Sequence, residues 1–202
     1  VLKFVLGAIL LLLPLGNLPG QDAKPAVEDD YYPLLALPIP EGVVLEASAL
    51  EMMAGGTLAV ASRRGGIYLV ENPLSPSAET MKFNLFAGGL HEVLGLARKG
   101  EGLFVTQRCE VTRVLDTNKD QLADLFETVS DGWEINGDYH EYAFGSRHDR
   151  DGNIWVVLCL TGSFNSNSKY RGWCLRITPE GKVIPTCSGI RSPGGIGMNA
   201  AG

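Results

Sequence analysis

The hydrophobic positions of the chain occur in short runs, and these runs recur as pairs along the sequence. Each pair follows a glycine or aspartate turn and consists of two β-rich runs separated by a polar break. The first runs of the three pairs start at Leu58, Leu103 and Ile154, at intervals of 45 and 51 residues. Short runs rich in Val, Ile, Phe and Trp between Gly, Asp and Asn indicate antiparallel hairpins. No amphipathic helix separates them, which disfavours a parallel α/β fold.

A period of about 40–50 residues that contains several strands is typical of one blade of a β-propeller. The sequence therefore predicts an all-β fold, an incomplete β-propeller of which about three blades are present. An ordinary β-sandwich is the alternative. In this interpretation Leu58, Leu103 and Ile154 begin the innermost strands of their blades. Three blades do not close a ring, so we expect the chain to be the N-terminal part of a longer propeller.

The first 31 residues differ from the repeats. Lys3 precedes an apolar run over residues 4–13, and a break rich in proline and glycine follows, a pattern typical of a secretory signal peptide. A buried helix is the alternative, and the run is shorter than the roughly 20 residues of a membrane span. We expect a signal peptide over residues 1–20, a disordered leader over 21–31 and the propeller over 32–202. The protein is then secreted or periplasmic, without a stable membrane span.

The net charge of the chain limits the classes of partner that it is expected to bind. Its 202 residues carry 23 acidic and 17 basic side chains, which gives a net charge of −6. The sequence shows no cluster of lysine and arginine. Nucleic-acid binding, which depends on such a basic patch, is therefore disfavoured.

Residues 116–127 place side chains that carry oxygen at the spacing of a twelve-residue calcium loop. Gln121 stands where such loops have glycine, and no helices flank the segment. A solvated acidic turn between two strands is the alternative. The expected ligands of a structural Ca²⁺ are Asp116, Asn118, Asp120, the carbonyl of Leu122, Asp124 and Glu127.

Two histidines occupy corresponding places in the repeat. His91 precedes the second pair of runs, His140 precedes the third, and each is followed by glutamate. Loops that enter the inner strands of a propeller gather at one mouth of its channel, so we expect both histidines to face that mouth. A surface or hydrogen-bonding role is the alternative.

Several motifs, in order and at consistent spacing, resemble the glucose/sorbosone dehydrogenase family. They are residues 94–97, His140 with the Phe-Gly pair at 144–145, residues 151–156 and residues 188–197. That family consists of secreted six-bladed propellers, the best known of which use pyrroloquinoline quinone (PQQ). The segment DTNKDQLADLFETVSDGW and the later YHEYAFG resemble a planctomycete-type branch of membrane-bound dehydrogenases. The resemblance covers residues 32–202, the N-terminal half of such a propeller.

The resemblance implies a reaction and residues for it. His140 is the expected general base, which takes a proton from a sugar or alcohol hydroxyl while hydride passes to the quinone. Arg191, with His91, is the expected cofactor contact. Tyr142-Ala143 stands where the PQQ enzymes have a Gly-Arg or Gly-Lys pair, and the sequence has no Cys-x-x-Cys-His haem motif.

The resemblance also implies an electron acceptor, and two other classes of function stay open. The electron acceptor is expected to be a cytochrome c-type protein or a downstream haem domain. We do not expect this chain to be active alone. A non-catalytic, calcium-stabilised propeller binding module is the alternative function, and a propeller lactonase or esterase is a third.

The four cysteines lack zinc-type spacing. Cys174 and Cys187 lie equally far from the turn at residues 179–182, a placement that would let them face each other across a hairpin. A Cys159–Cys174 bridge and four buried free thiols are the alternatives.

Overall fold

The computed structural model describes residues 25–160 and 168–199. The chain divides into two compact units, Val1–Leu35 and Ala36–Gly202. The predicted signal peptide lies outside the described residues. In the described part of the first unit, the acidic run Glu28–Asp30 forms a single 3-10 turn, η1. Among the described residues, no helix is long and apolar enough to cross a membrane.

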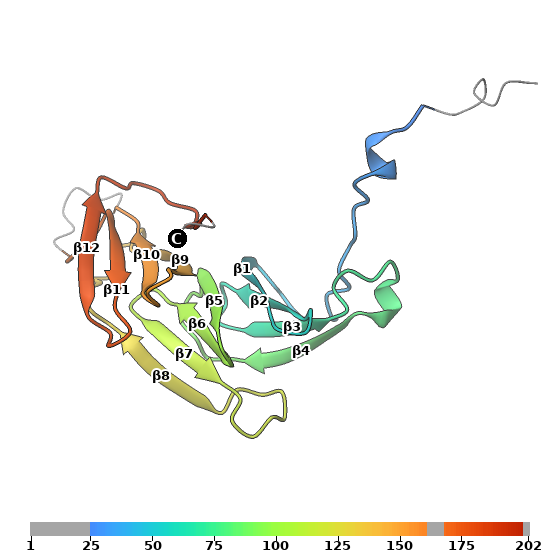
Figure 1. Cartoon of the computed structure of the whole chain (residues 1–202), viewed down its shortest axis with the longest axis horizontal. Coiled ribbons are helices and arrows are strands. Elements are labelled where there is room, and N and C mark those ends of the chain that lie inside the picture. Colours follow the sequence, from blue (N-terminus) through green and yellow to red (C-terminus); the bar gives the residue numbers. More distant parts are fainter. Residues whose placement is uncertain (1–24, 161–167, 200–202) are drawn as a thin grey trace, which may run out of the picture. The chain divides into compact units, whose positions relative to one another are not determined.

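The second unit is all β, as the sequence predicts, and contains three four-stranded antiparallel sheets (Figure 1). Each sheet is built from four consecutive strands, the arrangement of a propeller blade. A 3-10 turn, η2 (Ala78–Thr80), precedes β4. The first sheet contains β1 (Ala47–Met52), β2 (Leu58–Ser62), β3 (Ile67–Glu71) and β4 (Lys82–Ala87). The second contains β5 (Gly95–Lys99), β6 (Gly102–Thr106), β7 (Val111–Leu115) and β8 (Leu125–Ser130). The third contains β9 (Ala143–His148), β10 (Ile154–Leu158), β11 (Trp173–Ile177) and β12 (Val183–Ser188).

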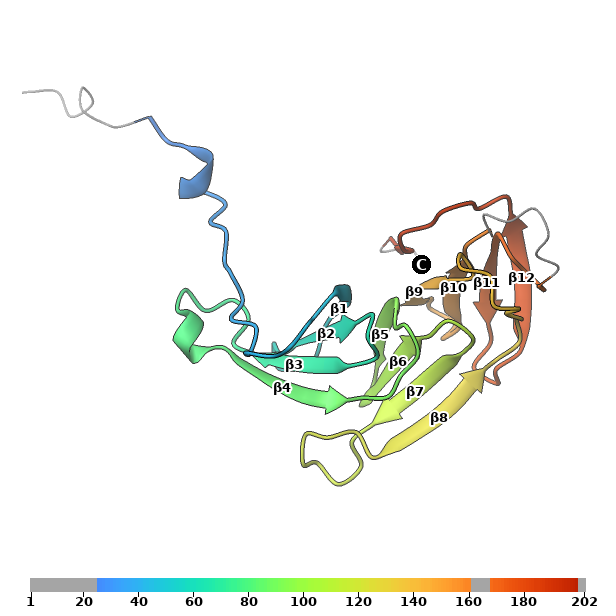
Figure 2. The ribbon, with the colours of Figure 1, turned by 180° about the vertical axis from the view of Figure 1, so that it is seen from behind.

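The innermost strands differ from those the sequence predicted. Neighbouring sheets meet through β1, β5 and β9, whereas Leu58, Leu103 and Ile154 begin the second strands β2, β6 and β10. Figure 2 shows the same succession of sheets from behind. The true innermost strands begin 48 residues apart in each case. They are rich in Gly, Ala, Ser and charged residues, so they lack the hydrophobic signature of a strand.

Small residues are required where the innermost strands converge. A side chain at Gly95 would place its Cβ 1.3 Å from the carbonyl oxygen of Gly145. The Ser48 hydroxyl donates to the carbonyl of Val93 at 2.5 Å, and so joins β1 to the loop before β5. The close approach explains why polar and tiny residues replace large apolar ones along this line.

The hydrophobic core consists of two layers between neighbouring sheets. Both are formed largely by the middle strands, whose valine, leucine and isoleucine side chains are fully buried. The layer between the first and second sheets contains Ala59, Ala61, Ile67, Phe86, Ala87, Val93, Leu96, Leu103, Val105 and Val114. The layer between the second and third contains Val111, Trp133, Ala143, Ile154, Val156, Leu158, Leu175 and Ile177.

Candidate functional site

The residues that the sequence singled out for catalysis lie at one end of the sheets. His91 precedes β5, His140 precedes β9 and Arg191 follows β12. β5 and β9 run side by side in the same direction, since the Gly145 N–H donates to the Leu94 carbonyl and Arg147 to that of Leu96. Antiparallel pairing within the third sheet then returns the end of β12 to the end where β9 starts. We call it the loop end. The structure therefore brings the three predicted residues to one side of the second unit.

A cluster of four side chains joins the three sheets at the loop end. Glu92 accepts hydrogen bonds from Arg63 at 3.2 Å and from Arg108 at 2.7 Å. Both guanidinium groups also lie over the ring of Tyr142, 5.5 and 5.1 Å from its centroid. Arg63 follows β2, Arg108 follows β6 and Tyr142 precedes β9. We refer to Arg63, Glu92, Arg108 and Tyr142 as the bridging cluster.

Glu92 is the centre of this cluster and is held ionised. Burial opposes its charge, but the hydrogen bonds and positive charges of Arg108 and Arg63 outweigh that penalty and lower its pKa. Its side chain is 20% exposed and that of Arg108 is 14% exposed, so solvent screens the pair only in part. Glu92 also has a backbone φ of 48°, in the left-handed region.

His140 lies beside the bridging cluster and has a carboxylate neighbour. Its side chain is 49% exposed, and its Nδ1 is 3.8 Å from Oδ1 of Asp138. The same oxygen accepts the backbone N–H of His140 at 3.0 Å. Arg108 donates to the Asp138 carbonyl and so links this loop to the bridging cluster. Tyr139 contacts the imidazole edge-on, with ring centroids 4.8 Å apart.

The two glutamates that follow the histidines have different surroundings. Glu141 is fully buried, and one of its oxygens accepts the backbone N–H groups of residues 136, 137 and 138. Ser168 donates to the other oxygen at 2.6 Å. Glu141 thus shapes the loop that carries His140, whereas Glu92 connects sheets. His91 is half-exposed, with its Nε2 4.0 Å from Glu92 and its backbone N–H bonded to Gln107 at 2.5 Å.

Arg191 is fixed through its backbone. Its carbonyl accepts the N–H of Leu160 at 3.1 Å and the thiol of Cys159 at 2.9 Å. The residue is exposed, and within the described residues no carboxylate lies at salt-bridge distance from its guanidinium. The Arg191 guanidinium is therefore available to an anionic group, whereas those of Arg63 and Arg108 already pair with Glu92.

The loop end carries the two kinds of group that the predicted quinone chemistry would require, a half-exposed imidazole at His140 and an exposed guanidinium at Arg191. A cavity of about 130 Å³ lies along the innermost strands and is lined in part by Ser48, Gly95 and Arg147. It includes none of the predicted site residues and is smaller than the roughly 300 Å³ of the smallest usual ligand pockets.

The predicted calcium loop joins β7 to β8, and its carboxylates bind the loop's own backbone. Asp116 accepts N–H groups from Lys119 at 2.6 Å and Gln121 at 2.8 Å. Asp124 accepts both the N–H and the hydroxyl of Thr117. Gln121 has a φ of 74°, so the backbone adopts the left-handed turn that glycine favours.

The remaining predicted ligands form contacts of their own, and the Asn118 amide donates to Asp120 at 3.1 Å. The Asn118 side chain accepts the N–H of Asp120 at 3.0 Å, and Asp120 accepts that of Leu122 at 2.8 Å. Glu127 lies on β8 and forms an ion pair with Arg113 at 2.9 Å. Across the parts of the chain that the structure describes, no group of three or more His, Cys, Asp or Glu residues could hold a metal ion. Calcium binding stays a prediction.

The three sheets define the second unit as part of a β-propeller. Residues 78–202 match the model of a family described as a domain of unknown function, DUF7133, and the chain belongs to that family. No curated protein is similar enough in sequence to match.

The solved structures that resemble the chain include the following two. One is a crystal structure from Thermus thermophilus, provisionally assigned as an oxidoreductase (glucose dehydrogenase), with a TM-score of 0.53 and 21% identity. The likeness covers 69% of this chain and 46% of that one, and it shows the fold alone. The other is virginiamycin B lyase from Staphylococcus aureus, with a TM-score of 0.38, 9% identity and coverage of 69% and 54%.

Proposed function

We propose that this chain supplies three sheets of a secreted or periplasmic propeller oxidoreductase. The enzyme oxidises a sugar or alcohol hydroxyl and transfers hydride to a quinone such as PQQ. The observation that carries the proposal is the half-exposed His140 imidazole, 3.8 Å from the Asp138 carboxylate, at the same end of the sheets as Arg191. The motifs that resemble the glucose/sorbosone dehydrogenases contain both His140 and Arg191.

In this mechanism His140 is the base. The imidazole accepts the hydroxyl proton of the substrate, and the Asp138 carboxylate lies 3.8 Å from its Nδ1. Arg191 binds the negative charge that develops on the oxygens of the acceptor. A bound quinone would supply the hydride acceptor.

The bridging cluster keeps the base in place. Arg108 is bonded to both Glu92 and the carbonyl of Asp138, and Tyr142 packs under its guanidinium two residues after His140. The loop that carries His140 is therefore held from the second sheet. A fixed base lowers the entropic part of the barrier to proton transfer.

A second candidate function is a non-catalytic binding module. It is favoured by the bridging cluster, in which Glu92 already forms ion pairs with Arg63 and Arg108. Arg63 and Arg108 both pair with Glu92, whereas no carboxylate lies at salt-bridge distance from Arg191 among the described residues. A cofactor with several carboxylates would therefore meet two arginines that Glu92 already engages, together with the exposed Arg191.

The experiment uses the full-length protein with PQQ and Ca²⁺, an artificial dye as electron acceptor and aldoses or alcohols as substrates. We expect dye reduction, and we expect His140→Gln to lower kcat by about 10²–10⁴-fold, the usual contribution of a general base. Lys82→Gln, a change at an exposed position of β4 outside the predicted site, is the control and should leave kcat within a few-fold. Unchanged turnover in His140→Gln rejects the assigned base. PQQ binding without turnover selects the binding module, and neither binding nor turnover removes the oxidoreductase.

A further inference from the structure

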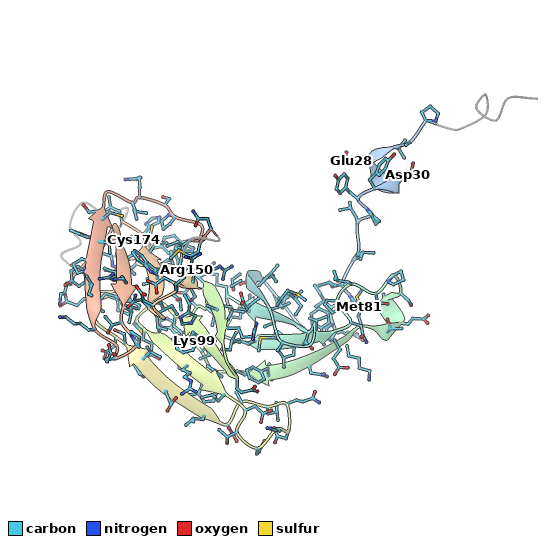
Figure 3. The ribbon with its side chains drawn as sticks, viewed as in Figure 1. Glu28, Asp30, Met81, Lys99, Arg150 and Cys174 are labelled. Carbon is cyan, nitrogen blue, oxygen red and sulfur yellow. The ribbon has the colours of Figure 1, made fainter. Side chains whose placement is uncertain are left out.

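Two cysteines of the third sheet face each other and play no part in the proposed site. Cys174 on β11 and Cys187 on β12 are register partners in the antiparallel pair. Figure 3 labels Cys174. Its side chain is 6% exposed, whereas Cys187 is exposed to solvent. Both are free thiols in the structure.

The two thiol groups are close enough to interact. Burial, together with the neighbouring Cys187 thiol, raises the pKa of Cys174. Directly opposite residues of an antiparallel pair have Cα atoms about 4.5–5.5 Å apart, which falls within the range that a disulfide spans. The backbone thus already holds the pair at bridging distance.

The other two cysteines are placed less well. Cys174 lies opposite Val157 on β10, so Cys159 is offset from it by two residues along the neighbouring strand. The Cys159 thiol donates instead to the Arg191 carbonyl at 2.9 Å. Cys109 lies in the turn between β6 and β7 of the second sheet. The structure therefore selects the β11–β12 pair among the possible pairings.

We propose that Cys174 and Cys187 form a disulfide when the chain meets a disulfide oxidant such as oxidised glutathione. The exposed Cys187 thiolate attacks the oxidant and releases one of its sulfurs as a thiol. Cys174, as thiolate, then displaces the second. The cysteine pair loses two protons and two electrons, and the oxidant becomes two thiols.

The proposed disulfide would join β11 and β12 where their backbone pairing is irregular. β12 is an outer strand, and its pairing with β11 shifts in register between Cys174 and Leu175. Pro185, opposite Leu175, has no N–H to donate to the ladder. A disulfide would hold β12 where its backbone pairing is weakest. It would also fix the start of the segment that leads to Arg191, four residues further on.

The test refolds the 202-residue chain in a mixture of oxidised and reduced glutathione, blocks free thiols by alkylation and digests with trypsin. Trypsin cleaves between the two cysteines, so GWCLR (172–176) and VIPTCSGIR (183–191) are separate peptides unless a disulfide joins them. We expect the joined pair by mass spectrometry, two hydrogens lighter than the sum and lost on reduction. Alkylation of both peptides, or a link from Cys174 to Cys159, overturns the proposal.

A second measurement shows that the bridge is structural. We expect the melting temperature of the oxidised chain to exceed that of the reduced chain by about 5–10 °C, because the closed loop restricts the unfolded state. Cys187→Ser, a change at an exposed position, should abolish this difference. Cys109→Ser is the matched control and should keep it. A difference that survives in Cys187→Ser contradicts the assignment, and neither readout depends on enzymatic activity.

Discussion

Replacing Glu92 by glutamine tests whether the bridging cluster holds the sheets together. The substitution keeps the size of the side chain but removes the charge that faces Arg63 and Arg108. Arg108 then keeps a positive charge at 14% exposure with no carboxylate partner at this position. The change should therefore destabilise the second unit rather than merely alter its surface.

The magnitude follows from burial. A hydrogen bond to a charged group contributes roughly 1.5–3 kcal/mol, which applies to the partly buried Arg108–Glu92 bond of 2.7 Å. Arg63 is 44% exposed, and ion pairs at such positions contribute at most about 1 kcal/mol. Glutamine retains one acceptor, so we expect a net loss of about 2 kcal/mol. In a chain of this size that corresponds to a melting temperature lower by about 4–8 °C.

Glu127→Gln is the matched control. It breaks an arginine–glutamate pair of similar length, 2.9 Å, in which both side chains are more than 40% exposed. We expect a loss below about 0.5 kcal/mol, because solvent screens such a pair. Urea denaturation followed by tryptophan fluorescence measures both variants. Equal losses in the two variants would refute the idea that burial in the bridging cluster makes Glu92 important.

The pH dependence gives an independent check on Glu92. Its pKa is lowered in the folded state, so its contribution to stability is present above the unfolded value near 4.5. That contribution disappears as the pH falls through the folded pKa. The stability difference between the native chain and Glu92→Gln should therefore shrink in acid. A difference that stays constant to pH 3 would contradict this linkage.

Three further changes have defined outcomes. Gly95→Ala should prevent soluble folding, because its Cβ would overlap a neighbouring backbone carbonyl. Gly88→Ala, which has open space around it, should match the native chain in expression and in its circular dichroism spectrum. Burial first, and then the charge of Lys99, lower the pKa of His148 in the folded state, so the free energy of unfolding should fall as the pH drops below about 6.5. Denaturation measured from pH 8 to 5 should show a smaller fall in His148→Leu. Replacing Asp116 and Asp120 together by asparagine should lower the melting temperature in Ca²⁺ but not in a chelator; an equal loss in both contradicts a bound ion.

The sequence predicted the number of sheets but placed the centre one strand too far along the chain. Leu58, Leu103 and Ile154 begin runs that stand out because the middle strands are buried on both sides. The innermost strands carry Gly and Ala, which are depleted in strands, and Ser, which is common in turns. Their small size follows from the convergence of neighbouring sheets, a tertiary constraint that a local pattern does not contain.

The loop end was predictable only in part. His140 and His91 were recognised because they occupy corresponding places in a repeat, and Arg191 because of a motif. The bridging cluster was missed, since its hydrogen bonds join residues 16 to 79 positions apart in the chain. The one signal was Tyr142, which departs from the motif of the resembling family at the position where the cluster forms.

The convergence of the innermost strands sets a gradient of tolerance to mutation across each sheet. Near Gly95 and Gly145 even one added methyl group collides with neighbouring atoms, so these positions accept almost no variation. The outer strands β8 and β12 are largely exposed, and β4 is buried only at its last two residues. Substitutions among relatives should therefore accumulate in the outer strands. Those strands can then evolve new binding surfaces while the innermost strands keep their sequence.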